Sequence, residues 1–236
     1  AGAFLAYRSM EFIRDDVCFQ NLNVKIVGMG SGLSWSSLGP THHTTEDISV
    51  LRAIPNLMIL SPATPRQVVA CVQTAYEHDG PVYIKIGMNH EKEYFEDNYV
   101  HDIKKSDCLR EGKNIAVFVT GSILEEAVKT CEMLEQDGIS AKLINVTTIK
   151  PFNEKEVIDI VKEIDKVAVI EEHNIHGGLA SIISETITYN GLEARVIPIG
   201  LNDTFAEGYG TYAMVRKANQ LDAINIYRRM KEAYEE

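Results

Sequence analysis

Two adjacent histidines, His42 and His43, are the residues of this chain best suited to chemistry near neutral pH. They follow Gly39-Pro40-Thr41 and come shortly before a predicted helix start. A loop anchored by Gly-Pro pins the backbone, so that titratable side chains on it can face a ligand. A histidine pair on a polar loop is otherwise solvated surface. The sequence around the pair decides between these two interpretations.

Phe4 and Tyr7 form a second candidate group. Because residues three apart meet on one face of a helix, the two rings would lie together. Their flat faces suit a heteroaromatic ligand, which gains dispersion and quadrupole complementarity there. The same spacing is also typical of two side chains in a hydrophobic core.

Strands alternating with helices dominate the first half of the sequence. Apolar runs predict strands at 24–29, 57–60 and 81–86. Between the last two, Thr64 fits an N-cap, with Pro65 at the first helical position and Gln67 completing a capping box. We expect this helix to bury an apolar stripe made of Val68, Val69, Val72 and Ala75.

A polar stretch at 89–113 marks a predicted linker between two domains, 1–88 and 114–236. The second half then repeats the alternation, with strands predicted at 115–119, 141–146, 167–170 and 194–199, and a final helix at 221–234. Caps are predicted for two of its helices, at Ser122 with Glu125 and at Asn153 with Glu156. The alternation predicts an α/β fold in which right-handed crossovers build mostly parallel sheets.

The composition is that of an ordinary globular protein, with 45% hydrophobic and 24% charged residues. The formal net charge of -11 argues against a nucleic-acid partner, because such proteins gather positive charge to neutralise phosphates. No apolar run approaches the roughly 20 residues that span a bilayer, and the apolar opening lacks the basic lead of a signal peptide. We therefore expect a cytoplasmic protein with no membrane partner.

Two further patterns are better explained by structure than by ligands. Gly28, Gly30 and Gly32 have the wrong spacing for a dinucleotide fingerprint and precede a loop, so a closely packed turn is expected. The cysteines have no CxxC spacing, which favours reduced thiols over a disulfide framework or a zinc site; they are Cys18, Cys71, Cys108 and Cys131.

The region around the histidines resembles the pyrimidine-binding domain of thiamine-diphosphate enzymes of the transketolase family. The resemblance starts at Gly39-Pro40-Thr41-His42 and continues through Leu51-Arg52-Ala53-Ile54-Pro55-Asn56 and Pro62-Ala63-Thr64-Pro65. It covers nearly the whole chain. It implies two three-layer α/β/α domains, the first a partial thiamine-diphosphate-binding fold and the second similar to the transketolase C-terminal domain.

The resemblance also implies roles for individual side chains. Phe4 and Tyr7 match the aromatic segment around the aminopyrimidine ring and are expected to bind the cofactor. His42 matches a histidine that contacts the sugar near its reacting oxygen, where an imidazole can donate or accept a proton, so we expect it to be catalytic and substrate-binding. His43 has no such counterpart in long-chain transketolases and is grouped with His42 on the substrate side.

Parts of the family's cofactor site have no match in this sequence. The glutamate that activates the cofactor lies, in the family, upstream of the aromatic segment. In the family, the diphosphate and its Mg²⁺ are held by a separate domain, and that domain's Asp-Asn metal motif does not occur here. We therefore expect no metal ligands in this chain, and incomplete binding of thiamine diphosphate and Mg²⁺ by the chain alone.

Two departures from the family concern the substrate. Leu38 stands where long-chain transketolases carry an aspartate that recognises sugar hydroxyls, and Met88 where the family often has an arginine that binds the sugar phosphate. A thioether cannot replace a bidentate guanidinium. Lys85 could substitute, but strand alternation predicts that it points to the other face. The substrate is therefore predicted to differ from the usual pentose phosphate.

The turn Glu171–Gly178 is the most polar strand-to-helix turn of the second half. Its histidines, His173 and His176, could share one helical face, but no third ligand has a spacing that fits a metal site. The matching turn of the family serves mainly in subunit contact. A structural or interface role is expected.

The leading hypothesis is the C-terminal part, or subunit, of a transketolase-like enzyme that transfers a two-carbon ketol unit between sugars. Its expected partners are a second copy of the chain and/or an N-terminal subunit carrying the diphosphate-binding domain, with a small sugar as substrate. Alternatives are the C-terminal part of a deoxyxylulose-phosphate synthase, the beta subunit of a 2-oxoacid dehydrogenase, and a non-catalytic assembly or regulatory module. The presence of His42, Phe4 and Tyr7 together opposes the last of these.

Overall fold

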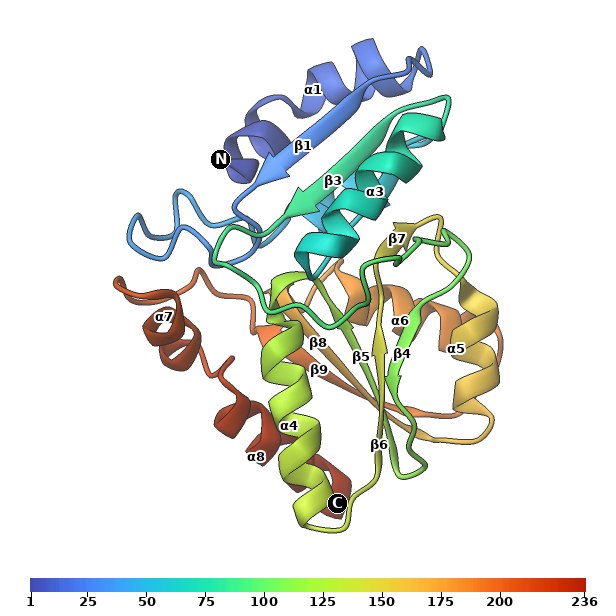
Figure 1. Ribbon diagram of the computed structural model, residues 1–236, viewed down its shortest axis with the longest axis vertical. Coiled ribbons are helices and arrows are strands. Elements are labelled where there is room, and N and C mark those ends of the chain that lie inside the picture. The colour runs from blue at the N-terminus through green and yellow to red at the C-terminus, as the bar shows by residue number, and fades with distance from the viewer.

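The chain forms two β-sheets, one in each half of the molecule, and the computed structural model describes residues 1–236 (Figure 1). The upper sheet in Figure 1 has four strands in the order β1-β3-β2-β7, and the lower has five in the order β4-β6-β5-β8-β9. All pairings are parallel except β2 with β7 and β4 with β6. The predicted α/β class with mostly parallel sheets is confirmed.

The first sheet lies between two layers of helices. Its strands are β1 (Lys25–Met29), β2 (Met58–Leu60), β3 (Val82–Ile86) and β7 (Thr148–Lys150). One face packs against α3 (Pro65–Glu77), through a small cluster that includes Cys71 and Ala75. The other layer consists of η1 (Phe4–Arg8), α1 (Met10–Phe12), η2 (Ile13–Cys18) and α2 (Asp47–Leu51).

The second sheet is also covered on both faces. Its strands are β4 (Asp107–Arg110), β5 (Ile115–Thr120), β6 (Ala141–Asn145), β8 (Lys166–Asn174) and β9 (Arg195–Leu201). The apolar side chains of α4 (Leu124–Gln136) and α8 (Ala223–Glu235) pack on one face, and those of α5 (Glu154–Val161) and α6 (Leu179–Tyr189) on the other. The short η3 (Gly121–Ile123) precedes α4, and α7 (Tyr212–Ala218) precedes α8. None of the helices has the length and apolar character needed to cross a membrane.

Helix α3 begins as predicted but buries a stripe that agrees with the predicted one only at Ala75. The Thr64 hydroxyl accepts from the amide of Gln67 at 3.3 Å, while the Gln67 side chain accepts from Ala63 N at 2.9 Å. The buried residues are Gln67, Cys71 and Ala75. Val69 and Val72 are 71% and 49% exposed, so their predicted burial is wrong. The helix covers the sheet along one narrow line and leaves Val69 and Val72 on the outer side.

Two predicted capping boxes do not form. The N-cap of α4 is Ile123 and makes no side-chain cap bond, because Gly121 turns the chain with φ +70° and starts a 3₁₀ turn there. Asn153 is the N-cap residue of α5, as predicted, but its side chain makes no capping bond and donates instead to the carbonyl of Lys104 at 2.6 Å. Glu156 accepts from the amide of Ser106 at 3.2 Å. The side chains of Asn153 and Glu156 therefore bind the backbone at Lys104 and Ser106, in the connection between the two sheets, rather than the first turn of α5.

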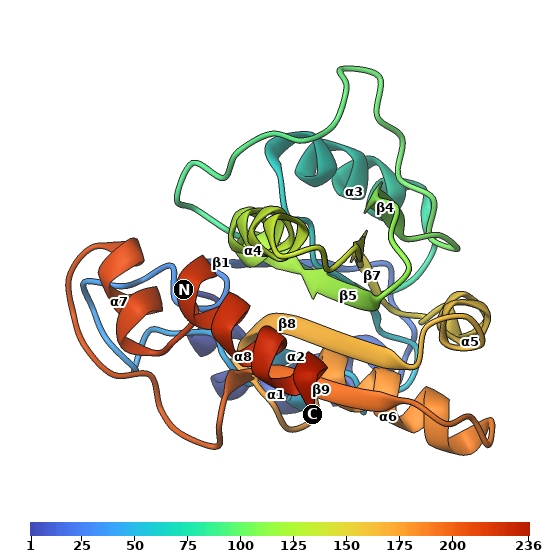
Figure 2. The ribbon, with the colours of Figure 1, turned by 90° about the horizontal axis from the view of Figure 1, so that it is seen from below.

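The stretch 89–113, predicted to be a linker, contains β4, which pairs with β6 of the second sheet. The rest of this connection passes over α3 (Figure 2), where Arg66 binds the carbonyl of Phe95 and the carboxylate of Asp97. In the opposite direction, β7 comes from the second half of the sequence but pairs with β2 of the first sheet. The two halves of the fold therefore interlock.

Gln67 joins the two halves through a buried polar network. Its Nε2 donates to Asp107 Oδ2 at 2.8 Å and to Thr147 Oγ1 at 2.9 Å. Its Oε1 accepts from Asn145 Nδ2 at 3.1 Å, in addition to the amide of Ala63. A single side chain of α3 thus satisfies several buried groups of the second half.

Replacing Gln67 by Ala should lower the free energy of unfolding by about 3 kcal/mol, because several buried donors and acceptors lose their partner. Urea denaturation of the purified chain measures this change. Gln73→Ala is the matched control: it lies on the same helix, and its side chain donates only to Glu77 on the surface. That control should cost less than about 0.5 kcal/mol. Equal losses for the two variants would contradict the role given to Gln67.

Candidate active site

His42 and His43 lie on a loop, residues 31–46, that connects β1 to α2 and is called here the histidine loop. Its two ends are tied together by backbone bonds, from Gly32 N to Thr44 O at 3.2 Å and from Thr44 N to Gly32 O at 2.9 Å. The Thr44 hydroxyl also donates to Gly30 O at 3.0 Å. The base of the loop is therefore fixed at the carboxyl end of β1, as in sites that form where parallel strands end.

His42 lies against Phe4 of η1. The two ring centroids are 5.0 Å apart with an interplanar angle of 70°, an edge-to-face contact. The hydroxyl of Thr41 is 3.0 Å from His42 Nδ1, which leaves Nε2 as the nitrogen able to face a ligand. The side chain of His42 is half-buried and that of Phe4 is 40% exposed. Two side chains that are distant in sequence thus form one accessible wall.

Tyr7 lies on the same π-helical turn as Phe4 and is fixed by Glu46 at the end of the histidine loop. Its hydroxyl donates to Glu46 Oε2 at 2.8 Å and accepts from Glu46 N at 3.0 Å. Burial and the negative charges of Asp47 and Glu46 raise the pKa of Tyr7, so it stays a neutral phenol. With 37% of its surface exposed, Tyr7 extends the aromatic wall that Phe4 begins.

His43 points into the protein. Its side chain is 2% exposed, and neither ring nitrogen has a hydrogen-bond partner. Burial lowers the pKa of His43, and the charge of Glu172 partly opposes that shift. His43 is therefore a neutral imidazole behind His42, and the adjacency in sequence does not give the two rings the same surroundings.

A buried charge pair that sequence analysis did not identify lies under the loop. Lys85 Nζ is 2.5 Å from Asp47 Oδ1 and donates to Thr44 O at 3.0 Å, while the Tyr83 hydroxyl donates to Asp47 Oδ2 at 2.8 Å. Lys85 therefore supports the loop from beneath rather than facing a substrate. A lysine within an apolar strand could have indicated this pair, because a buried charge requires a partner.

The sequence matches two family descriptions in tandem. Residues 2–89 match "Transketolase, pyrimidine binding domain" and residues 104–226 match "Transketolase, C-terminal domain". The second match alone covers more than half of the chain. The chain belongs to the transketolase family.

Relatives of this transketolase-family chain include subunits and sections of divided enzymes. It is 33% identical over 226 residues to one subunit of the apulose-4-phosphate transketolase of Actinobacillus succinogenes, covering 96% of this chain and 73% of the relative. It is 34% identical over 231 residues to a putative transketolase C-terminal section of Methanocaldococcus jannaschii, covering 97% and 72%. A solved split-gene transketolase, described as an inactive beta4 tetramer, superposes with a TM-score of 0.90 at 29% identity, covering 99% of this chain and 74% of that one.

The two family departures both lie at the surface. Leu38, on the histidine loop, is 45% exposed, and Met88, just after β3, is 37% exposed. Met88 lines a cavity of about 340 Å³ whose wall also includes Pro62, Val68 and Ile86. Neither histidine of the loop lines it. Lys85 does not take the place of the family's arginine, since it pairs with Asp47 beneath the loop.

The polar turn after β8 has a structural arrangement. Glu171 accepts from the amides of Leu179 and Ala180 at 2.8 and 2.9 Å, at the start of α6. His173 belongs to β8, is buried, and its Nδ1 donates to Asn174 O at 2.6 Å, whereas His176 is exposed. The two histidines thus share no helical face. No group of three or more His, Cys, Asp or Glu side chains is placed to hold a metal ion.

The burial of His43 predicts a dependence of stability on pH. Its folded pKa lies below the value of about 6.5 expected in the unfolded chain, so the unfolded state binds more protons in acid. The free energy of unfolding should therefore fall as the pH drops below about 6.5. His43→Gln should remove part of this loss of stability in acid. The rest should persist, because burial also lowers the pKa of His101, which this variant retains. Urea titrations at pH 8 and pH 5.5 measure both; an unchanged pH dependence in His43→Gln would contradict this account.

Proposed function

We propose that this chain is the C-terminal subunit or section of a transketolase-type enzyme that transfers a two-carbon ketol unit between sugars. The observation that carries the proposal is the contact between the partly exposed ring of Phe4 and the imidazole of His42, with the partly exposed Tyr7 on the same helical turn as Phe4. Membership of the transketolase family supports it. So do the names of two relatives, which describe one as a transketolase subunit and the other as a transketolase C-terminal section.

Thiamine diphosphate fits this wall through its ring. The exposed faces of Phe4 and Tyr7 suit a flat pyrimidine, and Glu46 holds the Tyr7 ring in place. When bound, the cofactor supplies the nucleophilic carbon that breaks and re-forms carbon–carbon bonds of sugars. Mg²⁺ does not fit this chain, because no acidic cluster is available to bind it. In the proposed enzyme, a partner subunit carrying the diphosphate-binding domain therefore supplies the magnesium and diphosphate site.

His42 acts on the sugar in this proposal. Its Nδ1 is engaged by Thr41, so Nε2 is the atom that would hydrogen-bond a reacting hydroxyl and exchange a proton with it. The edge contact with Phe4 fixes the plane of the imidazole. His43 is assigned a supporting position behind it, because a buried ring without partners cannot reach a ligand at the surface.

The substrate is proposed to be a small sugar that is recognised with little help from charge. Leu38 offers no hydrogen-bond acceptor, and Met88 cannot form the bidentate contact that an arginine makes with phosphate. Both side chains are partly exposed and so present apolar surface to a ligand. Phosphorylated and unphosphorylated ketoses should consequently differ less as donors than they would with an arginine at position 88.

Assembly is part of the proposed function, with a second copy or an N-terminal subunit as partner. Strand β1 is an edge strand, and its Val27 and Met29 are 44% and 54% exposed. On the same side of the sheet, α3 exposes Val69, Val72 and Tyr76. Open edges and apolar surfaces of this kind favour association.

The catalytic assignment is tested by mixing the chain with the diphosphate-binding subunit, thiamine diphosphate and Mg²⁺, and measuring ketol transfer. His42→Ala should lower kcat/KM by about 100-fold, within the range that general acid–base groups contribute. His78→Ala is the control, because His78 follows α3 at the edge where β3 begins, opposite the histidine loop. Unchanged activity in His42→Ala would remove the residue from the mechanism. Formation of 1-deoxyxylulose phosphate instead of ketol transfer would favour the synthase alternative.

The assembly proposal predicts that the isolated chain self-associates as its concentration rises. Sedimentation velocity of the wild type should show oligomers, and Val72→Lys should weaken them by placing a charge on the apolar side of α3. Val100→Lys is the control, since Val100 is 82% exposed on the connection between the sheets. A strict monomer at all concentrations would contradict self-association.

A further inference from the structure

The histidine loop is held from above by a carboxylate of the second half of the fold. Glu172, at the carboxyl end of β8, is 4% exposed, and its Oε2 accepts from the amide of Leu33 in the loop at 3.2 Å. Gly32 adopts φ +55°, and a Cβ there would lie 2.3 Å from Glu172 Oε2. The loop backbone therefore approaches this carboxylate as closely as a glycine permits.

Two side chains of α7 fix Glu172. Arg216 Nε donates to Glu172 Oε1 at 2.5 Å, and the Tyr212 hydroxyl donates to Oε2 at 2.6 Å. Arg216 Nη2 donates in turn to Ser122 O and to Tyr212 Oη, both at 2.7 Å. The guanidinium also stacks over the Tyr212 ring, 3.9 Å from its centroid. These contacts hold the carboxylate where it accepts the Leu33 amide.

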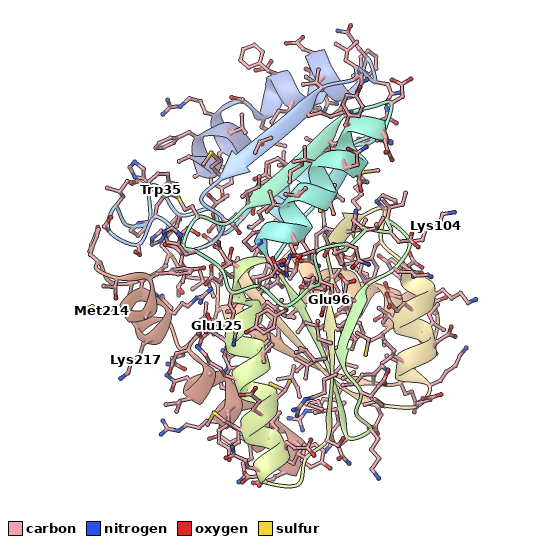
Figure 3. The ribbon with its side chains drawn as sticks, in the orientation of Figure 1. Trp35, Glu96, Lys104, Glu125, Met214 and Lys217 are labelled. Carbon is pink, nitrogen blue, oxygen red and sulfur yellow. The ribbon has the colours of Figure 1, made fainter.

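Further contacts connect the same loop to the second half. Asn174 N, two residues beyond Glu172, donates to Thr45 O at 2.7 Å. The Ser36 hydroxyl donates to Gly210 O at 2.9 Å, and Gly210 N to Ser36 O at 3.2 Å. Figure 3 shows the result: Trp35 of the loop and Met214 of α7 lie on the same flank of the molecule.

The contact between Glu172 and the histidine loop lies at the carboxyl end of β8 in the second sheet. The strand order reverses between β5 and β8, and the crevice at the carboxyl ends of such strands is where open α/β sheets bind ligands. Here the space is occupied by the first half. Leu33 packs in the core of the second sheet, and Ser61 lies near Gly121, whose Cβ would be 3.1 Å from the Ser61 hydroxyl. The histidine loop therefore fills this crevice.

We propose that Glu172, held by Arg216 and Tyr212, is a positioning residue that fixes the pose of His42 through the histidine loop. The inference rests on the proposed function for its catalytic consequence. The His42 ring interacts with Thr41 and Phe4, and its backbone amide donates to Gly39 O within the loop, so its placement depends on the loop backbone. A buried ion pair adds little net stability compared with apolar packing, which favours a role in geometry over a role in stability alone.

Trp35 reports the loop pose directly, because it is the only tryptophan of the chain. Its indole lies against Gly30, where a Cβ would be 2.1 Å from Trp35 Nε1. Glu172→Gln should shift Trp35 emission to longer wavelength and increase acrylamide quenching in the isolated chain, since the amide no longer satisfies Arg216 and releases Leu33. Glu171→Gln is the matched control: it is an adjacent, equally buried carboxylate that binds α6 and does not touch the loop.

In the assembled enzyme, Glu172→Gln should lower kcat by 10- to about 100-fold, the loss expected from a displacement of about 1 Å at a reacting group. Glu171→Gln should leave kcat unchanged after correction for folded fraction. Tyr212→Phe removes one hydrogen bond to Glu172 but keeps the ion pair, so it folds even if Glu172→Gln does not, and should give smaller changes in the same direction.

Two results would overturn the inference. Trp35 emission that responds equally to the substitutions at 171 and 172 would show that Glu172 does not hold the loop. A Trp35 change in Glu172→Gln with unaltered kcat would show that the contact does not position His42. If the wild-type assembly transfers no ketol unit, the proposed function fails, and the Trp35 measurements still decide whether Glu172 holds the loop.

Discussion

The buried ion pair between Lys85 and Asp47 is the interaction on which the candidate site depends. Neither charge could stay buried alone, because an unpaired ion in the interior costs several kcal/mol. The Tyr83 hydroxyl and the carbonyl of Thr44 complete their hydrogen bonding, which fixes one end of the histidine loop above β3. Glu172 fixes the loop from the other sheet. The loop that carries His42 is thus held by buried charges from both halves of the fold.

The architecture was predictable where hydrophobic patterning is strong. Apolar runs predicted nearly all central strands, and the cap at Thr64 predicted the start of α3. The edge strand β7 was not predicted, because Thr148–Lys150 has no apolar run of its own and forms a strand by pairing with β2. Burial on α3 was predicted correctly for Ala75 but not for Val69 and Val72, since an amphipathic pattern does not show how wide a stripe its neighbours will cover.

The candidate site was predictable only in part. The motif around His42 and the spacing of Phe4 and Tyr7 predicted an aromatic and imidazole group, and the structure brings Phe4 and His42 into contact. The opposite surroundings of His42 and His43 were not predictable, since they depend on a loop closed by long-range backbone bonds. The ion pair between Glu172 and Arg216 joins residues 44 apart in sequence, and no local sequence pattern indicates it.

One hydrophobic cluster includes side chains from both halves, among them Ile48 and Leu51 with Ile149 and Ile183. The covalent connection across 89–106 is consequently not what keeps the halves together. A protease that cut this exposed segment would yield two fragments that remain bound as a single noncovalent particle, because the interface between them has the character of a protein interior. The two halves therefore stay together whether or not the backbone is intact between 89 and 106.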